Sequence, residues 1–114
     1  MASATDNNQV MQWHKIAESF LEIERVKGNP WQVRVAGRDM CIVVHNGEGY
    51  GCSAKCPHAG GIMANGHING LGQIVCPLHQ YRFDLRNGRN VSGEGYFLKT
   101  YPVKETDDGV FVGL

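Results

Sequence analysis

The sequence lacks an excess of charge of either sign. Lys and Arg number 11, Asp and Glu also number 11, and the 114-residue chain has a formal net charge of +0. A protein without a basic field has little bulk attraction for nucleic acid or for an anionic membrane. We therefore expect neither as a partner, and any charged docking patch must be local.

Long hydrophobic runs are absent as well. No segment approaches the roughly 18 apolar residues that a membrane-spanning helix requires, and the polar start, MASATDNNQV, contains no apolar stretch of a secretory signal. We expect residues 1–10 to form a flexible tail, residues 11–114 to form a single domain, and the protein to be cytoplasmic. Because thiols stay reduced there, the four cysteines are expected to be ligands or free thiols rather than disulfides.

Two signatures of enzymes are also missing. The sequence has no Gly-rich dinucleotide-binding fingerprint. It also has no recognisable set of two histidines and one carboxylate that would hold an oxygen-activating metal. We therefore expect a protein without a substrate site of its own, rather than an enzyme acting alone.

Glycine, in contrast, is abundant at 15 of 114 residues. Many glycines follow Asn or Asp, and these dipeptides supply the positive φ angles of tight hairpin turns. Short runs of strand-forming residues lie between the turns: WQVRVA, CIVVH, YGCSA, QIVCP, YRFDL, YFLKTYPV and VFVGL. This spacing predicts an antiparallel all-β fold, a sandwich or small barrel. Asn46-Gly47 and Asp108-Gly109 are expected to join neighbouring strands, whereas ESFLEIERV could be helical or extended.

Two pairs of metal-binding residues stand close in the sequence, Cys56 with His58 and Cys76 with His79. Each cysteine is followed by proline, and glycines between the pairs allow the backbone to approach a bound group. A lone Cys or His is usually structural, but this repetition indicates a shared site. Zinc fingers usually keep two cysteines in one close pair and two histidines in another. Mixed pairs suit a cofactor with two metal centres, with a zinc-binding interaction module as an alternative.

The segments CPHAGGIM and CPLHQYRFD resemble the Rieske motif, C-x-H-x-G followed by C-x-x-H. A Rieske centre is a two-iron, two-sulfide cluster in which two histidines replace two cysteines on one iron. The resemblance implies one [2Fe–2S] cluster per chain, with Cys56 and Cys76 on one iron and His58 and His79 on the other. It implies that the histidines bind iron through Nδ1 and that their remote ring nitrogens lie near the surface. It also implies a Rieske-like β-sandwich base that carries a small cluster-binding subdomain made of two loops.

The same resemblance implies a function in electron transfer. Small standalone Rieske proteins are ferredoxins, so we expect a one-electron carrier that passes electrons from a flavin NAD(P)H reductase to an oxygenase component. The segment YFLKTYPVKETDDGVFVGL also resembles the small subunit of NAD(P)H-dependent nitrite reductase. The alternative is therefore a Rieske-like subunit beside a large catalytic chain.

The sequence departs from the high-potential respiratory members of this family. Gly61 and Leu78 stand where those proteins carry a disulfide, and Tyr81 and Phe83 stand where they carry a Ser and a Tyr hydroxyl. Fewer hydrogen bonds to the sulfurs stabilise the reduced cluster less. We therefore expect a potential near the low end of the family range of about −150 to +300 mV. Gln80 replaces a glycine that many Rieske ferredoxins carry.

Other candidate residues are interpreted as structural. Cys41 and Cys52 lie in strand-like runs and are expected to be buried, inert thiols. Met63 is expected to shield the cluster, and His67 to be an exposed loop residue.

Overall fold

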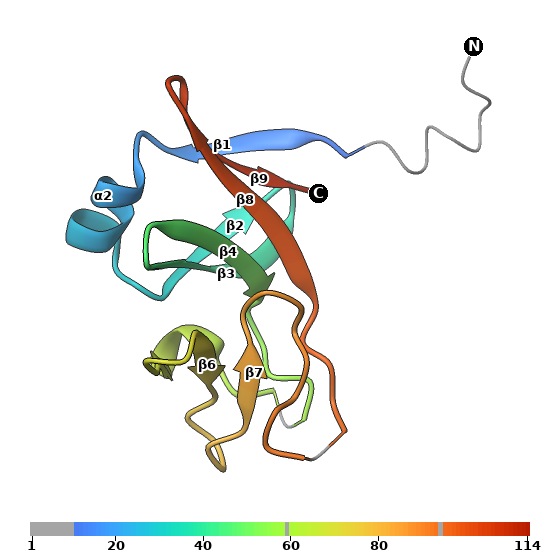
Figure 1. Cartoon of the computed structure of the whole chain (residues 1–114). Helices are drawn as coiled ribbons and strands as arrows, with labels where there is room; N and C mark the ends of the chain where they lie inside the picture. The colour runs from blue at the N-terminus through green and yellow to red at the C-terminus, as the bar shows by residue number, and fades with distance from the viewer. Residues whose placement is uncertain (1–10, 59, 94) are drawn as a thin grey trace, which may run out of the picture.

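A computed structural model describes residues 11–58, 60–93 and 95–114 (Figure 1). The tail predicted for residues 1–10 lies outside the described residues. The elements in chain order are β1 (Trp13–Ala17), α2 (Phe20–Glu22), the π-helical turn η1 (Ile23–Lys27), β2 (Trp31–Val35), β3 (Arg38–His45), β4 (Glu48–Ser53), the 3-10 turn η2 (Met63–Asn65), β5 (His67–Ile68), β6 (Gln73–Val75), β7 (Arg82–Asp84), β8 (Thr100–Thr106) and β9 (Gly109–Gly113). The prediction of an all-β fold is confirmed. None of the helices in the described part of the chain is long and apolar enough to cross a membrane.

Within the described residues, the strands form two antiparallel sheets. The larger sheet has six strands in the order β1-β9-β8-β4-β3-β2, and the smaller has three in the order β5-β6-β7. Figure 1 shows the smaller sheet and its loops at one end of the molecule, joined to the larger sheet by the segments after β4 and before β8. We call residues 55–99 the loop subdomain. This arrangement matches the predicted β base with a small subdomain.

Turn chemistry explains the two hairpins that the sequence predicted. Asn46 (φ 51°) and Gly47 (φ 79°) form the turn between β3 and β4, as expected for residues that tolerate the left-handed region. The β8–β9 hairpin is also present, but its turn residues are Asp107 and Asp108. Gly109 already pairs with Thr106 as the first residue of β9, so the predicted turn position was wrong by one residue.

The segment left open between helix and extended structure is helical. Ser19 begins α2, and its hydroxyl accepts a hydrogen bond from the Glu22 N–H at 3.0 Å. The Glu22 carboxylate in turn accepts one from the Glu18 N–H at 2.9 Å. The first bond is the one that an S-x-x-E sequence makes at a helix start, whereas the second reaches Glu18, the residue before the N-cap Ser19.

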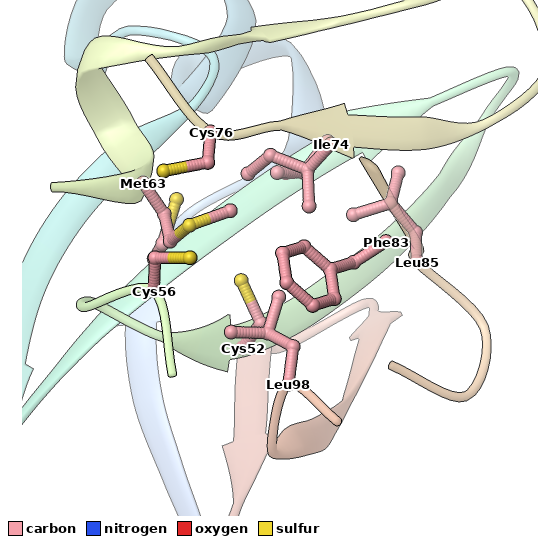
Figure 2. Close-up of a cluster of buried hydrophobic side chains, with 10 residues drawn as sticks. Cys52, Cys56, Met63, Ile74, Cys76, Phe83, Leu85 and Leu98 are labelled. Carbon is pink, nitrogen blue, oxygen red and sulfur yellow. The ribbon is translucent and has the colours of Figure 1, made fainter. Parts of the chain in front are cut away.

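Strand β3 lies between two groups of buried side chains. Met40, Ile42 and Val44 belong to a core inside the six-stranded sheet, whereas Cys41 and Val43 belong to the core of the loop subdomain. Successive side chains of a strand point to opposite faces, so an unbroken apolar run here means burial on both sides. The sheet therefore supports the loop subdomain directly (Figure 2).

Candidate metal centre

The first of the two loops begins at the end of β4 and closes on itself. The Cys56 N–H donates to the Gly61 carbonyl at 2.7 Å, and the Gly60 N–H donates to the Cys56 carbonyl at 2.9 Å. These bonds hold Cys56 at the base of the loop, and His58 lies between them in sequence. Pro57 has no N–H to donate, but it does not disturb this loop because both donors belong to other residues.

The second loop joins β6 to β7. Cys76 directly follows β6, and its N–H donates to the Tyr81 carbonyl at 2.8 Å. Inside this loop, His79 (φ 64°) and Gln80 (φ 58°) are both left-handed, a conformation that costs non-glycine residues roughly 1–2 kcal/mol each. The fold holds His79 in this strained turn, which carries its imidazole to the exposed tip.

The two loops place the thiols on the inside and the imidazoles on the outside. Cys56 and Cys76 are 2% and 0% exposed, His58 is half-buried and His79 is exposed. The two thiols lie within hydrogen-bonding reach of each other, and burial raises the pKa of Cys76. A buried thiol becomes a thiolate readily only beside a positive centre such as a metal ion.

The two imidazoles meet directly. Nδ1 of His79 lies 3.1 Å from Nε2 of His58, and Nδ1 of His58 lies 4.0 Å from the Cys56 sulfur. Nδ1 is the nitrogen expected to bind iron in both residues. In His79 it faces the His58 ring, whereas in His58 it faces the Cys56 thiol. All four residues predicted from the sequence are brought to one place, although they are 2 to 23 positions apart.

Glycine is required where the two loops touch. A Cβ atom added to Gly61 would lie 2.8 Å from the Cys76 sulfur and 3.1 Å from Cγ of Leu78. Distances this short force a neighbour to move. Gly61 therefore leaves space around the Cys76 sulfur that any larger residue would fill.

Aromatic rings cover the His58 imidazole. The Tyr81 ring stacks on it with a centroid separation of 3.9 Å and an interplanar angle of 29°, and the Tyr96 ring lies 5.8 Å away at 64°. From the sequence, Tyr81 was predicted only as a possible source of a hydroxyl group, and no role was predicted for Tyr96. No local motif could have identified Tyr96, because the folding of a distant segment brings it to this loop.

The remaining cysteines are buried, as predicted. Cys41 and Cys52 are 0% and 1% exposed and lie opposite each other on β3 and β4. Two causes raise the pKa of Cys52 well above its usual value: mainly a hydrogen bond with Cys41, and also burial. All four cysteines are free, and Met63 is fully buried in the same core (Figure 2). His67 is exposed as predicted, although it lies on β5 rather than in a loop.

The donor set fits a cluster with two metal centres. Among the residues that the structure describes, no three His, Cys, Asp or Glu side chains gather as a set that could hold one metal ion. A Rieske cluster needs only two protein ligands on each iron. Two adjacent buried thiols and two adjacent outer imidazoles meet that requirement.

Comparison with known proteins decides the family. The family model for the Rieske [2Fe-2S] domain matches residues 12–102. The chain belongs to the Rieske family. One [2Fe–2S] cluster is therefore the cofactor of this Rieske protein.

Curated relatives of this Rieske protein are components of oxygenase systems. The ferredoxin component of the naphthalene 1,2-dioxygenase system of Pseudomonas aeruginosa is 35% identical over 89 residues, which are 77% of this chain and 85% of that protein. The ferredoxin component of the 2,4-dinitrotoluene dioxygenase system of Burkholderia sp. (strain RASC) is 36% identical over 84 residues, 73% of this chain and 78% of that protein.

Solved structures share its fold. The ferredoxin of carbazole 1,9a-dioxygenase from Nocardioides aromaticivorans IC177 superposes with a TM-score of 0.76 at 24% identity, covering 89% of this chain and 96% of that one. A protein assigned as the small subunit of an NADH-dependent nitrite reductase from Mycobacterium tuberculosis gives 0.78 at 17% identity, covering 92% and 96%. At these identities the likeness establishes the fold alone.

Proposed function

We propose that this Rieske protein is a one-electron carrier that takes electrons from a flavin NAD(P)H reductase and passes them to an oxygenase component. The observation that carries the proposal is the match of the Rieske family model over residues 12–102, together with relatives named as ferredoxin components of dioxygenase systems. The geometry of the site supports this role, because His79 is exposed and its ring contacts that of His58, so a partner can approach the imidazoles.

We assign Cys56 and Cys76 to the inner iron and His58 and His79 to the outer iron. The burial of both thiols and the exposure of His79 support this order. When bound, the cluster supplies a redox centre that accepts one electron. Two ferric ions, two sulfides and two thiolates sum to zero charge, so an electron is accepted more easily than by a cluster with four thiolates.

The chain's own residues exclude water and orient the ligands. Met63 and Phe83 are fully buried in the core that contains both thiols, and Tyr81 stacks on the His58 ring. A dry site strengthens the electrostatic interactions of the cluster with its surroundings. Stacking limits rotation of the ring and so keeps its geometry similar before and after electron transfer.

We further propose that the protein has no substrate site and that residues 11–114 form one domain. Two surface pockets, of about 360 and 260 Å³, are lined by residues of β1, α2, η1, β8 and β9 and of the turns beside them, and neither is lined by a proposed ligand. Four free cysteines support a reducing compartment, and we infer a cytoplasmic location.

The second candidate function is that of a nitrite reductase small subunit. The structural likeness to the mycobacterial protein, with a TM-score of 0.78 over 92% of this chain, favours it. A carrier of this kind would remain attached to a large catalytic chain. Co-purification of the tagged protein with a sirohaem-containing chain from its own cells would support this candidate over a freely diffusing ferredoxin.

A reductive titration tests the electron-carrier function. We expect anaerobically purified protein to take up one electron per chain from dithionite and to return it to the oxidised oxygenase component of the naphthalene 1,2-dioxygenase system. Cys56→Ala should abolish the uptake, whereas Cys41→Ala, the matched control at another buried cysteine, should retain it. Failure of the wild-type protein to take up an electron reversibly would refute the function.

A further inference from the structure

The end of the molecule that carries His58 and His79 also exposes large apolar side chains. Leu78, Tyr96 and Phe97 are 43%, 39% and 69% exposed. Leu78 precedes His79 in the chain, and the Tyr96 ring lies 5.8 Å from the His58 ring. Exposed apolar surface therefore adjoins both imidazoles.

The backbone fixes the outward direction of Phe97. Its neighbour Leu98 is only 2% exposed, and the Leu98 N–H donates to the Gly88 carbonyl at 2.8 Å. Phe97 itself forms an antiparallel bridge with Arg89. Phe97 is 69% exposed while the backbone on both sides of it is held by these bonds, so its ring lies in solvent. An aromatic residue held in this way can anchor a partner without first paying the entropy of being ordered.

The charges of the molecule are not evenly distributed between its two ends. Residues 56–81, which contain all four proposed ligands, include no Lys, Arg, Asp or Glu. Around them, the loop subdomain contains five cations and two anions: Lys55, Arg82, Arg86, Arg89 and Lys99 against Asp84 and Glu94. The rest of the chain contains six cations and nine anions. A chain of zero net charge is thus positive at the end that carries the imidazoles.

Most of these cations are available to a partner. Asp84 pairs with Arg86 at 2.8 Å. The other four cations are exposed, and none forms an ion pair with a residue that the structure describes. An exposed cation without an ion pair can attract an acidic surface during approach.

One of these arginines, Arg89, lies beside an exposed aromatic residue, and a second, Arg82, contacts the segment that leads to it. The Arg82 carbonyl accepts a hydrogen bond from the Val91 N–H at 2.9 Å. Arg89 faces Phe97 in the antiparallel bridge. The apolar surface is therefore flanked by positive charge.

We propose that Leu78, Tyr96 and Phe97, flanked by Arg82 and Arg89, form the docking surface for a protein redox partner whose contact surface is apolar at its centre and acidic at its edge. The inference rests on the proposed electron-carrier function, because only an electron carrier needs a redox partner. In the reaction one electron leaves the reduced cluster and the partner's redox centre gains it. A partner that covers Tyr96 reaches a ring that lies 5.8 Å from that of His58.

The charge of the partner can be tested with two haem proteins. Stopped-flow mixing of the dithionite-reduced protein with cytochrome b5, an acidic acceptor, should give a rate constant that falls as salt is added. With cytochrome c, a basic acceptor, the rate constant should rise or stay level. Arg89→Glu should slow the reaction with cytochrome b5 about tenfold at low salt, whereas Arg25→Glu, an exposed change on η1, should alter it less than twofold. The reverse order of salt dependence would overturn the proposal.

The apolar contact is tested with the same acidic acceptor at high salt. Phe97→Ala should lower the rate constant about fivefold, the effect typical of an interface anchor. Val26→Ala is the matched control, because Val26 is 75% exposed on η1 in the base of the molecule. Equal rates for both variants and the wild type would remove Phe97 from the docking surface.

The outcome separates this inference from the proposed function. Each variant is first titrated with dithionite and its visible spectrum recorded. If the wild-type cluster takes up no electron, the function fails and docking is irrelevant. If it takes up one electron in every variant but the acceptor rates do not respond to Arg89 or Phe97, only the docking surface is refuted.

Discussion

At the scale of single residues, Gly61 lies where the two loops meet. Its missing side chain leaves room for the Cys76 sulfur, which an added Cβ would approach to 2.8 Å. We predict that Gly61→Ala loses its cluster about tenfold faster than the wild type, because overpacking a tight contact costs about 1–3 kcal/mol. The decay of visible absorbance under a chelator measures this.

The control for this change is Gly70→Ala. No heavy atom lies within 4 Å of a Cβ added at Gly70, and its φ is not in the left-handed region. The Gly70→Ala protein should keep its cluster as long as the wild type. Equal decay rates for both alanine variants would show that the contact at Gly61 is unimportant.

Gln80 carries a conformational cost that glycine would remove. Its φ of 58° follows that of His79 at 64°, and glycine adopts this region without steric penalty. Gln80→Gly should raise the free energy of unfolding by about 1 kcal/mol and leave the visible spectrum unchanged. Urea unfolding followed by circular dichroism is the measurement, and a destabilised variant would contradict the prediction.

The sequence predicted some of these residues and not others. Ligand spacing is set by the cluster itself, so Cys56, His58, Cys76 and His79 could be identified as candidates from a local motif. The stacking of Tyr81 on His58 and the approach of Tyr96 depend on how distant segments fold together. No pattern of neighbouring residues encodes them.

At the scale of elements, hairpins with a clear turn dipeptide were predictable. Asn46-Gly47 identifies the β3–β4 hairpin, because the turn requires positive φ angles at two consecutive residues and this dipeptide supplies them. Strand β1 was missed, since its sequence, WHKIA, has no turn dipeptide before it and buries only its last residue. The predicted run YFLKTYPV began too early, because β8 starts at Thr100 and burial of Leu98 fixes the preceding segment on the loop subdomain.

Asp84 is the last residue of β7, and its contacts predict a contribution to the stability of this element. Hydrogen bonds from the Arg86 side chain hold the pKa of this carboxyl below its usual value, and the Arg86 N–H also donates to it at 2.8 Å. Asp84→Asn should lower the free energy of unfolding at pH 7 by about 1 kcal/mol. Asp39→Asn removes a more exposed ion pair with Arg34 and should cost only a few tenths of this amount, about 0.2–0.5 kcal/mol.

The pH dependence of this effect has a definite sign. Because the folded pKa of Asp84 is lower than the unfolded value of about 3.9, ionised Asp84 stabilises the fold above that pH. The contribution is lost as the pH falls through the folded pKa. The difference between wild type and Asp84→Asn in thermal unfolding should therefore shrink below about pH 4. A constant difference across this range would exclude the carboxylate as its source.

At the scale of the whole molecule, the reduction potential reflects everything around the cluster. Phe83 is fully buried and has no hydroxyl, and no cysteine stands at position 61 or 78 to form a disulfide. We predict a midpoint near the low end of the Rieske range, at about −150 mV. Redox titration followed by EPR measures it, and a strongly positive midpoint would contradict the prediction.

The central claim is that two cysteine sulfurs bind one iron while two histidine nitrogens bind the other. Pulsed EPR of the dithionite-reduced protein, grown with ¹⁵N-labelled histidine, tests it most directly. The account predicts hyperfine coupling to two histidine nitrogens, and loss of that coupling pattern in His58→Cys and His79→Cys. A reduced cluster with no coupled histidine nitrogen would contradict it.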